Sequence, residues 1–249
     1  MGVGDMNSQL VEKLKLKYSP VAILFSNEKP KEAMQFQEGK RACVIALLTA
    51  VTKGKTAVFD RKTAGCVGGM AGICFGNQYH LMPGGIDYFL STGRGEGYPA
   101  GEGYIKTPEL AKAFADSLPY TDIEAEYVIF KPLRDVDCAA EKPALVCMYA
   151  NPDQLSALVV LANYDRETND NVVIPFAAGC QSICLLPYAQ GKKSLPKAVI
   201  GMTDITARPI VPAETLSFTV PFEMFQEMEK NSAGSFLDKE DWGKIAKRI

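Results

Sequence analysis

The sequence predicts a single α/β (or α+β) domain with two similar halves, a mixed sheet and a cleft between the halves. Short apolar runs typical of buried strands alternate with longer stretches that have helical periodicity. The 249 residues are 47% hydrophobic, which is enough to form one substantial core. Residues 20–62 and 143–205 show the same order of elements, so we interpret 1–249 as one domain built from pseudo-repeats.

The first pseudo-repeat, 20–62, contains apolar runs separated by a turn and by a glycine stop. A charged amphipathic helix is expected before it. The expected elements, in chain order, are a helix over 9–18, a strand over 21–25, a short helix through Met34 and Phe36, an apolar helix over 44–51 and a strand over 56–60.

The second pseudo-repeat, 143–205, follows the same plan with about fifteen extra residues before its cysteine. The expected elements are a strand over 144–149, a helix that begins at Asn151 and Pro152, a helix over 181–190 and a strand over 198–202. Eleven positions separate Cys43 from Gly54, and eleven again separate Cys180 from Gly191. Pro187 departs from the repeat, because a proline inside a helix kinks or ends it.

Outside the pseudo-repeats, the chain contains a Gly-rich loop and a helical tail. The loop, 91–104, has five glycines within eleven positions but lacks the spacing of a nucleotide-binding motif. A helix over 107–119 with Thr107 as its cap and a strand over 126–133 are expected next. The tail, 222–249, predicts helices that cover the core or a subunit boundary, and it holds the only tryptophan, Trp242.

The composition excludes several classes of function. The 27 basic and 29 acidic residues give a net charge of -2, so we expect no nucleic-acid partner. The single histidine excludes metal sites and catalytic motifs that require two histidines. No apolar run reaches the roughly 18 residues that span a membrane, and no secretion signal is evident, so we expect a cytoplasmic protein without a membrane partner. Seven cysteines in that compartment indicate thiols or metal ligands.

Four of these cysteines form the predicted metal site. Cys43 and Cys180 each precede an apolar helix, where the free backbone N–H groups stabilise a thiolate. Cys66 and Cys74 lie in AGCVGGMAGICFG, whose glycines allow the backbone to approach a bound group closely. We therefore predict an iron–sulfur cluster with a redox, sensing or substrate-activating role, and zinc is the alternative metal. The spacing of Cys66 and Cys74 matches no zinc or ferredoxin motif.

Two alternatives stay open. A metal-free module could bind a small anionic metabolite through the Gly-rich loop, with Arg94 and Arg208 as its anion ligands. A thiol enzyme could instead use Cys43 or Cys180 as nucleophile, with His80 as an acid or base. The expected partners are a small molecule or a redox protein, and a homodimer is plausible.

The remaining cysteines have simpler interpretations. Cys184 lies one helical turn after Cys180 and could replace one of the four ligands. Cys147 is expected to pack in a buried strand, and Cys138 to be a loop thiol.

The order of motifs also resembles the archaeal and bacterial family catalogued as domain of unknown function 169. The resemblance implies a cytoplasmic single-domain protein with cysteines at the positions of Cys43, Cys66 and Cys180, and it supplies no activity. The segments that carry it are PVAILF, RACVIALLTAVTKGKTAVF, GCVGGMAGICFG, GYIKTPELAKAFADSLP, AGCQSI and DITARPIVPAETLSFTVP.

Overall fold

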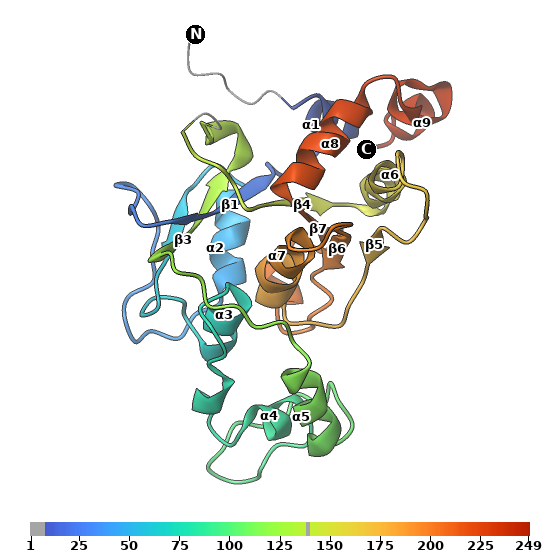
Figure 1. Ribbon diagram of the computed structural model, residues 1–249. Coiled ribbons are helices and arrows are strands. Elements are labelled where there is room, and N and C mark those ends of the chain that lie inside the picture. The colour runs from blue at the N-terminus through green and yellow to red at the C-terminus, as the bar shows by residue number, and fades with distance from the viewer. Residues whose placement is uncertain (1–7, 138–139) are drawn as a thin grey trace.

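The computed structural model describes residues 8–137 and 140–249 and shows a single α/β domain around a seven-stranded mixed sheet (Figure 1). The strand order is β2-β3-β1-β4-β7-β6-β5, and every neighbouring pair is antiparallel except β5 and β6. The strands are β1 (Val21–Ser26), β2 (Ala57–Phe59), β3 (Tyr127–Pro132), β4 (Leu145–Ala150), β5 (Val172–Val173), β6 (Ala198–Gly201) and β7 (Leu216–Pro221).

Helices cover both faces of the sheet, which makes three layers (Figure 1). One face packs against α1, α6, α8 and α9, and the other against α2, α3 and α7. The helices are α1 (Gln9–Leu14), α2 (Val44–Val51), α3 (Val67–Gly72), α4 (Ile86–Leu90), α5 (Pro108–Asp116), α6 (Pro152–Ala162), α7 (Leu186–Gly191), α8 (Phe222–Ser232) and α9 (Glu240–Ile245).

The side chains of the two central strands, β1 and β4, are buried on both faces of the sheet. Alternate side chains of a strand point to opposite faces. Ala22 and Leu24 of β1 therefore enter one core, whereas Val21 and Ile23 enter the other. All six residues of β4 are buried, including Cys147 at 2% exposure, which confirms the predicted core position of this thiol.

Most predicted elements are present, with shifts at their ends. The structure corrects the helix expected through Met34 and Phe36, because Met34 forms an isolated parallel bridge to Ala57 beside β2. The first helix ends at Leu14 rather than near residue 18, since Lys15 adopts the left-handed conformation that terminates it. Asn151 caps α6 through a capping box, as its position before Pro152 predicted.

The helix predicted over 181–190 is helical but not uniform. It begins as a π-helix over Gln181–Leu185 and continues as α7 from Leu186. Pro187 lies in the first turn of α7, where its missing N–H is tolerated, so the proline marks the change from one helix type to the other. Cys180 directly precedes the π-helix.

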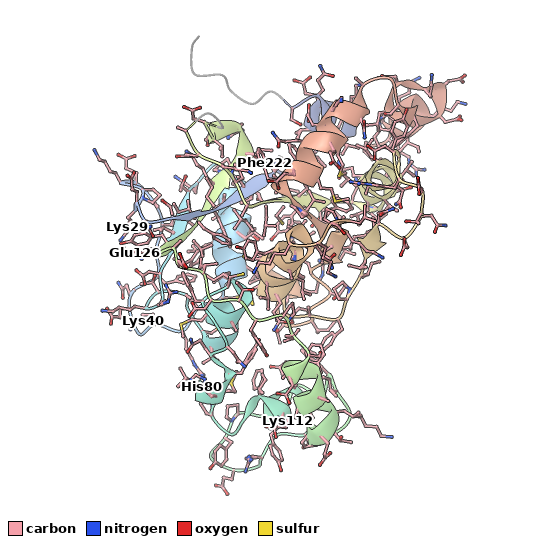
Figure 2. All side chains as sticks on the ribbon, viewed as in Figure 1. Lys29, Lys40, His80, Lys112, Glu126 and Phe222 are labelled. Atoms are coloured by element: carbon pink, nitrogen blue, oxygen red, sulfur yellow. The ribbon has the colours of Figure 1, made fainter. Side chains whose placement is uncertain are left out.

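A helical extension stands off the sheet below α3 and α7 (Figure 1). It contains α4 and α5, and the Gly-rich loop 91–104 connects them without forming a helix or strand. Lys112 of α5 points away from the body of the protein (Figure 2). The extension contributes no strand to the sheet, and Tyr104 of the loop and Phe114 of α5 both contact Phe176, which precedes the π-helix.

The tail packs on the sheet through α8 and on α1 through α9. Trp242 is buried and donates a hydrogen bond from Nε1 to the carbonyl oxygen of Lys13, 3.0 Å away. Within the described ranges, none of the helices combines the length and the apolar character that crossing a bilayer requires.

Candidate functional site

Three of the four predicted ligand cysteines line one cavity. Cys43, Cys66 and Cys180 come from three separate segments and border a cavity of about 660 Å³. Cys43 precedes α2, Cys66 precedes α3 and Cys180 precedes the π-helix. Each cysteine therefore lies where a chain segment enters a helix on the same side of the sheet. The fourth cysteine, Cys74, does not line this cavity.

A short backbone contact places Cys43 beside Cys66. The N–H of Ala42 donates to the carbonyl oxygen of Gly65 at 3.1 Å. The next residue in each segment is a cysteine, so Cys43 and Cys66 are neighbours. Gly65 has a φ of +80°, and a Cβ there would lie only 2.5 Å from the Ala42 oxygen. This close approach requires glycine.

The α3 segment also holds Cys180. The Cys180 thiol donates to the carbonyl oxygen of Gly68 at 3.1 Å, and the N–H of Gly69 donates to Cys66 Sγ at 3.1 Å. A Cβ on Gly72 would approach Cys180 Sγ to 2.4 Å, so only glycine lets α3 pack against this thiol. The glycines of the AGCVGGMAGICFG segment thus bring the backbone close to sulfur.

The surroundings of Cys43 and Cys180 favour the protonated forms of these two thiols. Burial raises the pKa of Cys180 well above its ordinary value of 9.0, and the nearby Cys66 and Cys43 thiols raise it further. Cys43 is an exposed residue, but partial desolvation by its surroundings still raises its pKa, against the lowering effect of backbone N–H groups at the start of α2. An electropositive partner is therefore needed to convert these groups to thiolates at neutral pH.

Cys74 pairs with Cys184 instead. Their Sγ atoms are 3.8 Å apart in the core between α3 and the π-helix, and both side chains are fully buried. Burial raises the pKa of the Cys184 thiol well above its ordinary value, and its hydrogen bond with Cys74 adds to this shift. Cys138 lies outside the described residues.

The two arginines predicted to bind an anion contact backbone carbonyls. Arg94 donates from Nε to the Gly84 carbonyl oxygen at 2.7 Å and lies over the Tyr88 ring. Arg208 donates to carbonyl oxygens within residues 212–215. Neither lines the cavity, whereas Arg41 does.

His80 lies at the outer edge of the chain that leads to α4 (Figure 2). Its side chain is exposed and does not border the cavity. The geometry therefore gives it no contact with the three cavity thiols.

Several cavity residues escaped sequence reasoning because they have no motif. Asp204, three residues after β6, accepts hydrogen bonds from the N–H of Gly179 at 2.9 Å and from Thr206. Tyr79 accepts a hydrogen bond from Gln181 Nε2 at 2.6 Å. The only available signal was that Gln181 follows a predicted ligand, and nothing in the sequence distinguished Tyr79.

The rest of the cavity wall is mostly apolar and comes from the helical extension. Phe176 joins this wall, with its ring centroid 5.3 Å from that of Phe114 and 5.7 Å from that of Tyr104. The main apolar side chains of the wall are Met82, Ile86, Phe89, Leu90, Phe114 and Phe176. The cavity is thus bordered by three thiols from the helices beside the sheet and by a mainly apolar wall from the helical extension.

The cysteines are not gathered around a single point. Across residues 8–137 and 140–249, no three histidine, cysteine, aspartate or glutamate side chains form a group that could hold a metal ion. The arrangement is one of three thiols spread along one end of a cavity.

The fold and the site define an α/β protein whose cavity has cysteines at the starts of three helical segments. The chain belongs to the DUF169 family, described as uncharacterised ArCR, whose sequence profile matches residues 9–231. The match covers most of the chain, from α1 into the last turn of α8, and thus includes all three cavity cysteines. Neither a curated protein nor a solved structure matches the chain.

Proposed function

We propose that the protein binds an iron–sulfur cluster through Cys43, Cys66 and Cys180 and activates a small molecule beside it. The supporting observation is that three thiols from three separate segments line one cavity. Cys74 was part of the predicted set, but its contact with Cys184 leaves it out of this proposal. Three protein ligands would leave one iron of a four-iron cluster open to the cavity.

The chemistry of the donors favours a cluster over zinc. In a cluster, each thiolate binds a different iron atom, so the ligands stand farther apart than they do around a single ion. The three thiols border one cavity, and within the described residues they do not form a group that could hold a single metal ion, which suits that requirement. A bound cluster would also supply positive charge that favours the thiolate forms of Cys43 and Cys180, whose pKa values the protein raises.

The two alternatives have less support. The anion-binding module would use Arg94 and Arg208, whose guanidinium groups already donate to backbone carbonyls. The thiol enzyme would need a nucleophile with a depressed pKa, whereas burial raises the pKa of both Cys43 and Cys180.

We also propose that the sheet arose by duplication, with the cavity between the two copies. The strand order supports this. If β1, β2 and β3 of one copy correspond to β4, β6 and β7 of the other, the order of these six strands is the same when it is followed from either edge of the sheet. The central pair, β1 and β4, is antiparallel, as a twofold relation requires. Cys43 and Cys180 then occupy matching positions, which accounts for their reaching the same cavity.

The test is anaerobic reconstitution with iron and sulfide, followed by iron and sulfide analysis and visible absorption. We expect the parent protein to bind a cluster, and Cys43→Ser, Cys66→Ser and Cys180→Ser each to reduce the bound iron severely. An added ligand such as imidazole should perturb the electron paramagnetic resonance spectrum of the reduced protein if one iron is open.

Cys147→Ser is the matched control, since this thiol is buried in β4 and does not line the cavity. Cys74→Ser separates the three-cysteine set from the four-cysteine set. A colourless parent protein, zinc at one equivalent in place of iron, or equal iron content in all variants would overturn the proposal.

A further inference from the structure

The hydroxyl group of Tyr79 is a buried donor at the polar end of the cavity. Its oxygen accepts the hydrogen bond from Gln181 Nε2, and its own proton has no acceptor among the described residues. The side chain is 7% exposed and borders the cavity. Burial raises the pKa of Tyr79 well above its ordinary value, so the proton stays on the oxygen at physiological pH.

Gly68 locates this donor relative to the thiols. A Cβ at position 68 would lie 3.7 Å from the Tyr79 hydroxyl oxygen and 3.9 Å from Cys66 Sγ. The same residue's carbonyl oxygen accepts the hydrogen bond of Cys180. The hydroxyl group of Tyr79 and the thiols of Cys66 and Cys180 therefore all lie close to Gly68.

The remaining wall decides what kind of molecule would fit. Aromatic and aliphatic side chains of the helical extension make up much of the rest of the lining, and they suit an apolar body. Asp204 and Glu102 also border the cavity, with Arg41 as the only basic residue among its described lining residues. Two carboxylates against one guanidinium disfavour an anion.

We propose that the cavity binds a neutral, mainly apolar organic molecule whose single oxygen acceptor, of the ketone or aldehyde type, accepts a hydrogen bond from Tyr79. The apolar body lies against Phe89, Phe114 and Phe176, and the oxygen lies at the thiol end. This inference rests on the proposed function for the role of the bound molecule. Binding itself requires only the cavity, so it is measured on metal-free protein.

The experiment compares three probes of similar size by titration calorimetry on the metal-free protein: acetophenone, ethylbenzene and benzoate. Acetophenone and ethylbenzene differ in the carbonyl oxygen, and benzoate adds a negative charge. We expect acetophenone to bind about three- to tenfold more tightly than ethylbenzene, which is the range of one hydrogen bond. Benzoate should bind more weakly than acetophenone.

Tyr79→Phe tests the donor. We expect the preference for acetophenone over ethylbenzene to disappear, while ethylbenzene still binds, which also shows that the variant is folded. Tyr164→Phe is the matched control, because this tyrosine is exposed just after α6 and does not line the cavity.

Equal binding of acetophenone and ethylbenzene to the parent, an unchanged preference in Tyr79→Phe, or tighter binding of benzoate would overturn the inference. The outcome is separable from the cluster experiment. Selective binding of acetophenone to a protein that fails to take up iron refutes the proposed function alone. A reconstituted protein whose metal-free form shows no such selectivity refutes this inference alone.

Discussion

The thiol of Cys180 donates a hydrogen bond to the carbonyl oxygen of Gly68, 3.1 Å away and 112 positions distant in sequence. This contact joins the start of the π-helix to the start of α3, two segments that reach the cavity from different parts of the sheet. It depends on small residues, since a Cβ on Gly72 would occupy the space of Cys180. The site therefore exists because glycines allow α3 to approach sulfur.

Gly72→Ala tests that dependence. The added methyl group would meet Cys180 Sγ at 2.4 Å and Cys180 Cβ at 2.7 Å, so α3 must shift. We expect the free energy of unfolding to fall by about 1–3 kcal/mol in urea denaturation. Gly243→Ala is the control, because a Cβ there meets nothing within 4 Å and lies in α9. That variant should gain about 0.5–1 kcal/mol; equal losses in both variants would contradict the explanation.

Asp204→Asn should make the cavity cysteines more reactive. The Asp204 charge is one of the causes that raise the pKa of Cys43 and of Cys180, after burial as the largest cause. Removing the charge lowers both pKa values, so iodoacetamide should alkylate Cys43 at lower pH than in the parent. Mass spectrometry of the peptide containing Cys43 measures the rate between pH 7 and 10. Asp122→Asn alters an exposed residue paired with Arg61, and it should leave the pH dependence of Cys43 alkylation unchanged.

Cys147 should make the protein less stable in alkali. Burial in β4 raises the pKa of this thiol to about 12, from an ordinary value of 9.0. Its protonated form stabilises the fold fully below pH 9, and that contribution is lost as the pH rises toward 12. The unfolding free energy should fall by at most about 1.4 kcal/mol per pH unit from this group. Cys147→Ala should flatten the decline.

Val146→Ala controls for the loss of volume in β4, since Val146 is buried but does not titrate. It should lower stability by a similar amount at every pH between 8 and 11. If the two variants show the same slope against pH, Cys147 is not a source of the alkaline decline.

Trp242→Phe tests how α9 is attached. The indole N–H donates to the Lys13 carbonyl oxygen at 3.0 Å, and the side chain is 5% exposed. Losing the bond and part of the buried volume should reduce the free energy of unfolding by about 1–3 kcal/mol, measured by circular dichroism. In the parent, emission of this single tryptophan should shift to the red when α9 detaches from α1. Coincidence of that shift with global unfolding would show that the tail belongs to the same cooperative unit.

Much of the fold could be predicted from local patterns. Apolar runs identified β1 and β4, and the Asn151 cap with Pro152 located the start of α6. These signals are short-range, so they survive without tertiary information. The helix expected through Met34 failed because a bridge to Ala57, far along the chain, overrides the local preference.

The candidate site was predictable to a lesser degree. The sequence indicated two cysteines before helices, Cys43 and Cys180, and two in a glycine-rich segment, Cys66 and Cys74. Three of these four line the cavity. It could not separate Cys74 from the others, because the fold turns this residue toward Cys184 and away from the cavity. It also gave no reason to select Tyr79, whose role depends on burial and on the acceptor contact with Gln181.

The sequence by itself determined the α/β class, the order of most elements and the shortage of histidine that makes sulfur the main soft ligand of this chain. Only the tertiary structure decided which thiols meet and what surrounds them. The reason is that side chains from separate segments meet only through tertiary contacts, such as the hydrogen bond between Ala42 and Gly65. Local sequence patterns do not encode contacts of this kind.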